Sequence, residues 1–291
     1  MHGLSSPGRS RSGYRTLLSL LPPAALALVA IPLSPVSAQV VIAPPVITLV
    51  EPERFGTFTV ENRSTVAQEV TVEFRFGYPA SDSAGNLRMV YDDSAAAARS
   101  SIVPWVRAFP RRVLLGAGQR QLIRLTLRPP EGLSDGVYWA RLVTSSVPES
   151  APVDTAQRGI SAQITFRLQQ ITTVLYRRGD ARTGIEFGPV AVRSDTAAVH
   201  VLVPLRRTGA APFIGSVKFR IEDARGALVQ EGVEAASVYY SLVKTFTVPR
   251  TRVAPGTYTA QVTAIAERPD VAPDALFPMT PAIFRTRFSV P

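Results

Sequence analysis

The chain of 291 residues contains no cysteine and only two histidines, and each scarcity excludes a class of chemistry. Without cysteine there are no disulfides, no zinc–thiolate sites and no thiol nucleophiles. His2 lies in a segment that we expect to be removed, so a site with two histidine ligands is excluded and only His200 remains for a catalytic triad. His200 lies in an alternating strand pattern, where we expect a surface or edge histidine. Chemistry by carboxylates alone stays open, although we interpret Asp92-Asp93 and Glu222-Asp223 as solvated turns.

Lysine is almost as rare, and arginine supplies nearly all of the positive charge, which gives a formal net charge of +10. The basic residues are scattered at one or two per predicted strand, whereas a nucleic-acid site needs them clustered. We therefore expect a solvated basic surface and no nucleic-acid partner. The chain also lacks a phosphate-binding loop and a cluster of metal ligands, so we expect no cofactor and no metal.

The N-terminal segment has the pattern of an export signal. Three arginines (Arg9, Arg11 and Arg15) precede an apolar run over residues 17–33, and small residues follow at Val36-Ser37-Ala38. A membrane anchor is the alternative, but a spanning helix needs about 20 apolar residues and three prolines interrupt this run. We expect a signal peptide over residues 1–38, cleaved near Ala38. The mature protein is then predicted to reside in a bacterial periplasm without a membrane span.

From Val40 onward the chain shows short alternating segments separated by turn signals. The predicted strands are residues 46–50, 56–60, 69–76, 102–109, 111–115, 121–127, 136–143, 159–178, 185–192, 199–205, 215–223, 227–231, 237–248, 257–266 and 282–290. Residues 77–101 are predicted to be a mobile loop around one short strand at 87–91. Strands at spacings of about 8–12 residues indicate an all-β sandwich architecture.

A weak internal repeat suggests two sandwiches of related plan. Gly136 and Tyr138 recur as Gly256 and Tyr258 at an offset of 120 residues. In each copy the glycine begins a strand and the tyrosine follows two positions later, as in the tyrosine corner of immunoglobulin-like sandwiches. We predict two immunoglobulin-like domains, over residues 39–178 and 179–291.

The segment from Gly159 to Arg178 is the longest predicted strand. Its first half places Ile164, Phe166 and Leu168 on one face, because successive side chains of a strand alternate between faces. An ordinary core strand that closes a sandwich has this pattern. So does a sheet edge that binds a partner by strand addition. The pattern leaves both interpretations open.

The segment around this strand resembles the periplasmic pilus-assembly chaperones of the PapD-like family. The similar residues form the block 103–125 (VPWVRAFPRRVLLGAGQRQLIRL), then residues 129–138, 164–169 and 175–177, together with Asn62. The resemblance covers residues 40–178 and implies a non-enzymatic chaperone. In this family the strand donates alternate apolar side chains to a pilin-like or other secreted subunit whose sheet is incomplete. The implied donors are Ile164, Phe166 and Leu168, and an outer-membrane usher is a further implied partner.

The chain departs from the family at the anchor for the subunit's C-terminal carboxylate. The family uses an arginine on the first strand and a lysine late in the donor strand. Here Val46–Val50 contains no arginine, and Thr173 stands at the lysine position. Arg54, Arg167 and Arg177 are the candidate replacements.

The leading hypothesis is a divergent chaperone that acts by donor-strand complementation without ATP. The alternative is an immunoglobulin-like envelope adhesion or scaffold protein without a chaperone cycle. An enzyme is the third interpretation.

Overall fold

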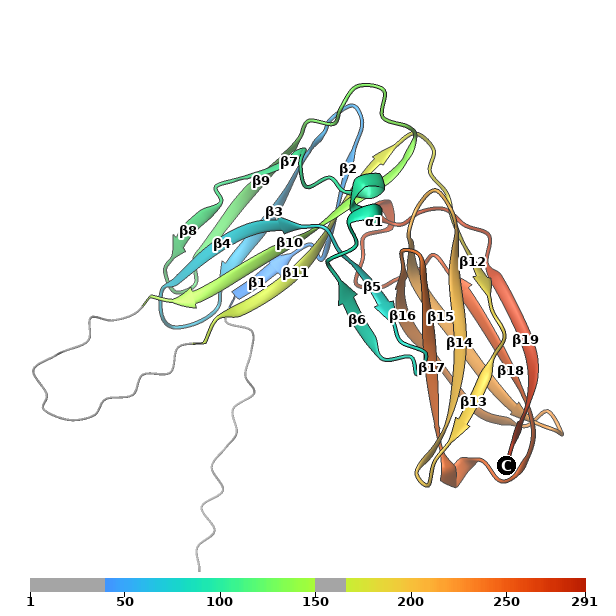
Figure 1. The fold of residues 1–291 in the computed structure, drawn as a ribbon. Helices are drawn as coiled ribbons and strands as arrows, with labels where there is room; N and C mark the ends of the chain where they lie inside the picture. The colour runs from blue at the N-terminus through green and yellow to red at the C-terminus, as the bar shows by residue number, and fades with distance from the viewer. Residues whose placement is uncertain (1–39, 150–165) are drawn as a thin grey trace, which may run out of the picture. The chain divides into compact units, whose positions relative to one another are not determined.

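Strands account for nearly all regular structure in residues 40–149 and 166–291, the ranges that the computed structural model describes (Figure 1). Within these ranges there is one α-helix and two single-turn 3-10 helices, η1 (Arg250–Arg252) and η2 (Pro273–Ala275). The all-β prediction is therefore confirmed. None of the helices in these ranges has the length and apolar character needed to cross a membrane. The predicted signal peptide, residues 1–38, lies outside the described residues.

The first sandwich consists of two sheets that enclose one apolar core. One sheet has the order β1 (Val40–Ala43), β3 (Phe55–Asn62), β9 (Arg120–Leu127), β7 (Val106–Phe109). The other has the order β2 (Val46–Val50), β11 (Leu168–Arg178), β10 (Gly136–Pro148), β4 (Gln68–Arg75), β8 (Arg112–Leu115). Alternate residues of each strand face inward, as the sequence pattern predicts, and Val60, Ile123, Leu142 and Tyr176 are fully buried between the sheets.

The chain crosses from one sheet of this sandwich to the other near its first strands. β1 pairs antiparallel with β3, whereas β2 pairs parallel with β11, from Val46 opposite Thr173 to Val50 opposite Arg177. Pro44 and Pro45 separate the two strands, and proline has no amide hydrogen with which to continue a ladder. β11 therefore gains a neighbour on this side only from Thr173 onward.

The second sandwich is built in the same way from the strands after Arg178. In one sheet β14 (Ala198–Gly209) pairs with β12 (Thr183–Phe187), β13 (Ala191–Ser194) and β17 (Ser241–Pro249). The other has the order β16 (Leu228–Val238), β15 (Phe213–Asp223), β18 (Gly256–Ile265), β19 (Ala282–Val290). Its core includes Val203, Phe213, Val217 and Phe246, all fully buried.

The tyrosine corners predicted from the repeat are confirmed in both sandwiches. The hydroxyl of Tyr138 donates to the carbonyl of Ser134 at 2.9 Å, and that of Tyr258 donates to the carbonyl of Ala254 at 2.8 Å. Each bond ties the start of a strand to the turn before it, as in immunoglobulin-like domains. The division into domains at residues 39–178 and 179–291 stays a prediction.

Three sequence-based predictions differ from the structure. The strand predicted at 185–192 is two strands, β12 and β13. The strand predicted at 237–248 is interrupted at Tyr239-Tyr240, where the chain passes from β16 to β17. The predicted loop at 77–101 contains a hairpin, β5 (Tyr78–Ser81) and β6 (Leu87–Val90), and a helix, α1 (Ser94–Ser100).

A third apolar cluster collects side chains from strands of both sandwiches. Its buried members are Val46, Phe76, Ala96, Val137, Trp139, Leu175, Ala181, Ala211, Ile214, Tyr239, Val271, Ala275 and Phe277. Trp139 lies at its centre, in ring contact with Phe76 and Tyr239. Its indole nitrogen donates to the carbonyl of Gly77 at 3.1 Å, so the buried polar atom is satisfied. This cluster explains why Tyr239 interrupts a strand.

Candidate partner-binding site

Strand β11 is paired along its whole length on one side and along only half of its length on the other. With β10 it forms a continuous antiparallel ladder from Leu168 opposite Ser146 to Arg178 opposite Gly136. On the other side β2 covers it only from Thr173 to Arg177. Within the described ranges no strand pairs with residues 168–172 on that side. This free edge, as we call residues 168–172, leaves main-chain groups available to an added strand.

The three predicted donor residues lie at or before the start of the free edge. Ile164 falls outside the described residues. Phe166 precedes β11 and is 76% exposed, and Leu168, its first residue, is 37% exposed. By alternation they share a face with Val174 and Tyr176, which are buried in the core of the first sandwich. The second half of this segment is thus an ordinary core strand, whereas its first half carries exposed apolar side chains.

At the end of the free edge the guanidinium of Arg141 lies beside Thr173. The two residues are direct partners in the β10–β11 ladder, and Arg141 Nη1 donates to Thr173 Oγ1. Arg141 Nε donates to the carbonyl of Gly77 at 3.0 Å, and its guanidinium carbon lies 4.5 Å from the ring centroid of Tyr239. These contacts hold the guanidinium beside Thr173, the residue at which the resemblance implies a lysine.

Arg141 carries a positive charge that no carboxylate balances among the described residues. The residue is only 6% exposed, and its Nη2 atom is buried without a hydrogen-bond partner. Most buried charges in proteins are paired, because an unpaired charge away from water is unfavourable. The arrangement therefore leaves one donor of a buried cation without a hydrogen-bond acceptor.

The three arginines proposed from the sequence as anchor replacements lie away from Thr173. Arg177 stands further along β11, between Val137 of β10 and Val50 of β2 in the ladders. Arg54 forms an ion pair with Glu51 and lowers the pKa of that carboxyl group, so its charge is already balanced. Arg167 lies several residues before Thr173 and borders a surface hollow that Arg141 does not line. Sequence reasoning did not single out Arg141. The available signal was one arginine within the apolar run from Val137 to Val143.

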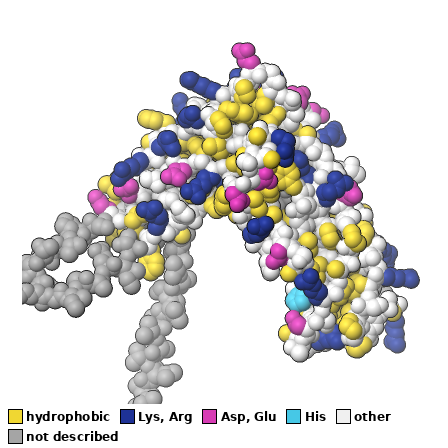
Figure 2. Space-filling model, in the orientation of Figure 1, with side chains coloured by type: hydrophobic (Ala, Val, Ile, Leu, Met, Phe, Trp, Pro, Cys, Tyr) yellow, Lys and Arg dark blue, Asp and Glu magenta, His cyan; other side chains and the backbone are white. Residues whose placement is uncertain are grey.

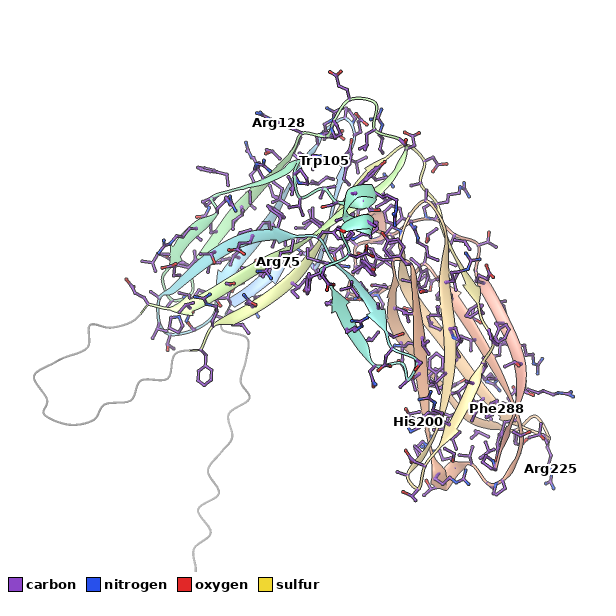
Figure 3. The ribbon with its side chains drawn as sticks, viewed as in Figure 1. Arg75, Trp105, Arg128, His200, Arg225 and Phe288 are labelled. Carbon is purple, nitrogen blue, oxygen red and sulfur yellow. The ribbon has the colours of Figure 1, made fainter. Side chains whose placement is uncertain are left out.

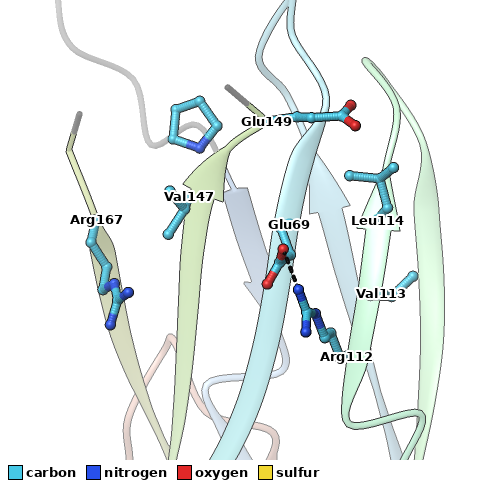
Figure 4. A pocket seen from close by; sticks show the side chains of 8 residues that line it. Glu69, Arg112, Val113, Leu114, Val147, Glu149 and Arg167 are labelled. Atoms are coloured by element: carbon cyan, nitrogen blue, oxygen red, sulfur yellow. Dashed lines mark hydrogen bonds and ion pairs between the residues drawn. The ribbon is translucent and has the colours of Figure 1, made fainter. Parts of the chain in front are cut away.

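The hollow that Arg167 borders has a volume of about 560 Å³ and is lined by residues of β4, β8 and β10 (Figure 4). Arg112 of β8 donates to Glu69 of β4 at 2.7 Å across it, and Arg167 borders it from the other side (Figure 4). The Arg112 side chain is 72% exposed, and exposed ion pairs contribute little to binding or stability. This hollow has no buried unpaired group comparable to Arg141.

Solved structures that are similar to this chain include one of a chaperone alone and two of a chaperone in complex with another protein. The YadV chaperone has 10% sequence identity and a TM-score of 0.47, with 86% of this chain and 100% of that chain covered. The CsuC–CsuE chaperone–tip adhesion subunit complex of Acinetobacter baumannii has 9% identity and a TM-score of 0.44, with 85% and 98% covered. The SafA pilin–SafB chaperone complex of Salmonella enterica has 12% identity and a TM-score of 0.42, with 84% and 95% covered. No protein-family model and no curated protein sequence matches the chain.

Charged side chains are interspersed over the surface in view, where Lys and Arg alternate with Asp and Glu (Figure 2). His200, which stands on β14 (Figure 3), bonds through Nε2 to Asp195 at 3.1 Å and through Nδ1 to Thr247 at 3.2 Å. β14 has paired strands on both sides, so His200 does not lie at a sheet edge, but its side chain is 31% exposed and agrees with the other expectation, a surface position. Through these two bonds His200 connects the turn before β14, at Asp195, to β17, at Thr247.

Proposed function

We propose that this chain is a non-enzymatic, ATP-independent chaperone of the periplasm, exported through the signal peptide at residues 1–38. Its client is a pilin-like or other secreted subunit with an incomplete sheet, which adds a strand to the free edge of β11. Ile164, Phe166 and Leu168 donate their apolar side chains to the client. The observation that carries the proposal is the free edge itself, which ends where β2 begins to pair at Thr173.

The position of Arg141 supports a direction for the added strand. The free edge meets Arg141 at its Thr173 end, which is the C-terminal end of that segment. If the client's terminal carboxylate accepts a hydrogen bond from the unpaired Nη2 atom, the client strand runs parallel to β11, as β2 does. Hydrogen bonds to charged groups are about twice as strong as those between neutral groups, so this contact also sets the register.

The test uses the full chain, expressed with its export signal and isolated with whatever client it retains. The client is identified by mass spectrometry, purified and titrated back against two aspartate variants. Leu168→Asp places a charge on the donor face and is expected to weaken binding about tenfold or more. Gln169→Asp is the matched control. Gln169 is exposed and follows Leu168 directly, so its side chain points to the opposite face of the strand. This variant should bind the client as the wild type does.

Hydrogen exchange of the backbone amides locates the added strand. Client binding should slow exchange within residues 168–172 and leave β16, an edge strand of the second sandwich, unchanged. Equal weakening by both aspartate variants, or protection confined to other strands, would show that strand addition is wrong. A partner bound equally by wild type and both variants would favour the envelope scaffold.

A further inference from the structure

A second hollow, of about 350 Å³, opens beside Arg141 and is mostly apolar. Pro79, Leu87 and Met89 of the β5–β6 hairpin line it, together with Ile171 of the free edge and Leu242 of β17. Leu87 is 63% exposed and Ile171 is 49% exposed. Apolar side chains that gather around a groove can mark a place where another molecule packs. We call this hollow the terminal pocket.

The charges of the terminal pocket are all positive. Arg141, Lys244 and Arg268 line it, and none of its lining residues is acidic. Lys244 is paired with Glu234 at 2.6 Å and Arg268 with Asp270 at 2.8 Å. Arg141 alone lacks a carboxylate, so the pocket combines apolar walls with one unbalanced cation. A ligand with one carboxylate and one apolar side chain matches this combination.

The terminal pocket is continuous with the free edge, because Ile171 belongs to both and Arg141 stands opposite Thr173 at the end of the edge. A strand that added parallel to β11 would reach this point with its last residue. We propose that the terminal pocket selects clients by their C-terminal residue and accepts an aliphatic side chain whose α-carboxylate bonds to Arg141. This inference rests on the proposed strand addition and extends it from anchoring a carboxylate to reading a side chain.

The hairpin is what makes such selection possible. Ser81 Oγ accepts from the amide of Val243 at 2.6 Å, and Thr245 Oγ1 donates to the carbonyl of Ala84 at 3.3 Å, so the hairpin is fixed against β17. Pro79, Leu87 and Met89 are thereby held as one wall of the pocket. Without that wall the carboxylate would be recognised, but the side chain next to it would face water.

The probe is a short fluorescent peptide that alternates valine and threonine and ends in leucine with a free carboxylate. Its binding to the full chain is measured by anisotropy against three matched peptides: the leucine amide, and free acids ending in aspartate or lysine. The free acid ending in leucine should bind roughly tenfold or more tightly than each of the others. Leu87→Asp should remove the preference for leucine, and Val233→Asp, equally exposed but on β16 outside the pocket, should retain it.

The outcomes separate this inference from the proposed function. If all four peptides bind equally and Leu168→Asp weakens them all, strand addition stands and terminal selection is wrong. If the leucine acid is preferred but Leu168→Asp has no effect, the pocket reads a chain terminus without strand addition. If N-acetyl-leucine alone competes as strongly as the peptide, the pocket is a small-carboxylate site and the proposal fails. No binding by any peptide overturns terminal selection, and the client titration then decides on strand addition.

Discussion

Arg141 of β10 donates to the hydroxyl of Thr173, its direct partner on β11. The resemblance to pilus chaperones implies a lysine at residue 173 itself. In this chain residue 173 is a threonine, and the guanidinium that contacts it comes from the neighbouring strand β10.

This relationship predicts that a lysine at 173 is harmful while Arg141 is present. Thr173→Lys should lower the free energy of unfolding by roughly 1–3 kcal/mol, because it removes a hydrogen bond and brings two partly buried positive charges together. The double variant Thr173→Lys with Arg141→Met should regain most of that loss. Denaturant unfolding of the two single variants and the double variant measures the coupling. Strictly additive losses would mean that the two side chains do not interact.

The two tyrosine corners should contribute unequally to the free energy of unfolding. Tyr138→Phe and Tyr258→Phe each remove one hydrogen bond, worth about 0.5–1.5 kcal/mol. The loss should be larger for Tyr258, whose side chain is buried, than for Tyr138, whose bond is exposed to solvent. Tyr91→Phe serves as the control, since Tyr91 is 39% exposed, and its unfolding midpoint should be unchanged. A larger loss for Tyr138 would contradict this ranking.

Substitution of Asn62, at the end of β3, should lower the stability of the protein markedly. Its side chain is fully buried, and Nδ2 donates to the carbonyls of Val66 at 2.8 Å and Leu115 at 2.9 Å. Asn62→Ala removes two hydrogen bonds of a buried side chain, although the carbonyl of Val66 keeps the hydroxyl of Ser64 as a donor at 2.9 Å. The change should cost roughly 1–3 kcal/mol in denaturant unfolding. Asn86→Ala, at an exposed turn, should cost less than about 0.5 kcal/mol. Comparable losses at both positions would show that burial does not decide the cost.

The hydroxyl of Tyr78 should lose its proton at a higher pH than the hydroxyl of an ordinary tyrosine. Burial raises its pKa to about 12, and its hydrogen bond to Asp93, 2.7 Å long, adds to the shift. A pKa above the unfolded value of about 10 means that its contribution to stability is present below pH 10 and is lost as pH rises toward 12. The ultraviolet absorbance of tyrosinate, compared between wild type and Tyr78→Phe, isolates this group. A difference curve centred near pH 10 would rule the shift out.

The strands of both sandwiches could be predicted because their information is local. Glu69 to Phe76 alternates, and the observed β4 differs from that prediction by one residue at each end. Gly256 and Tyr258 mark a turn and a strand within a few residues of each other. Such patterns need no knowledge of the partner strand.

The hairpin β5–β6 and the role of Arg141 could not be predicted, because both depend on contacts distant in sequence. The hairpin is held by Val243 and Thr245, more than 150 residues away. Arg141 is significant only because the ladder places it opposite Thr173, and sequence alone does not give that register. Tyr239 interrupts a predicted strand for the same reason, since its ring packs on Trp139.

The position of Val40, where the first strand begins, decides where a label can be attached to this protein. Gln170 of the free edge donates through Nε2 to the carbonyl of Val40, so the chain enters the first sandwich beside that edge. An affinity tag or fluorescent fusion joined upstream of Val40 would emerge next to the residues that we propose receive a client strand, and an extended tag would compete for them. Labels for binding measurements therefore belong after Pro291, beyond β19 of the second sandwich.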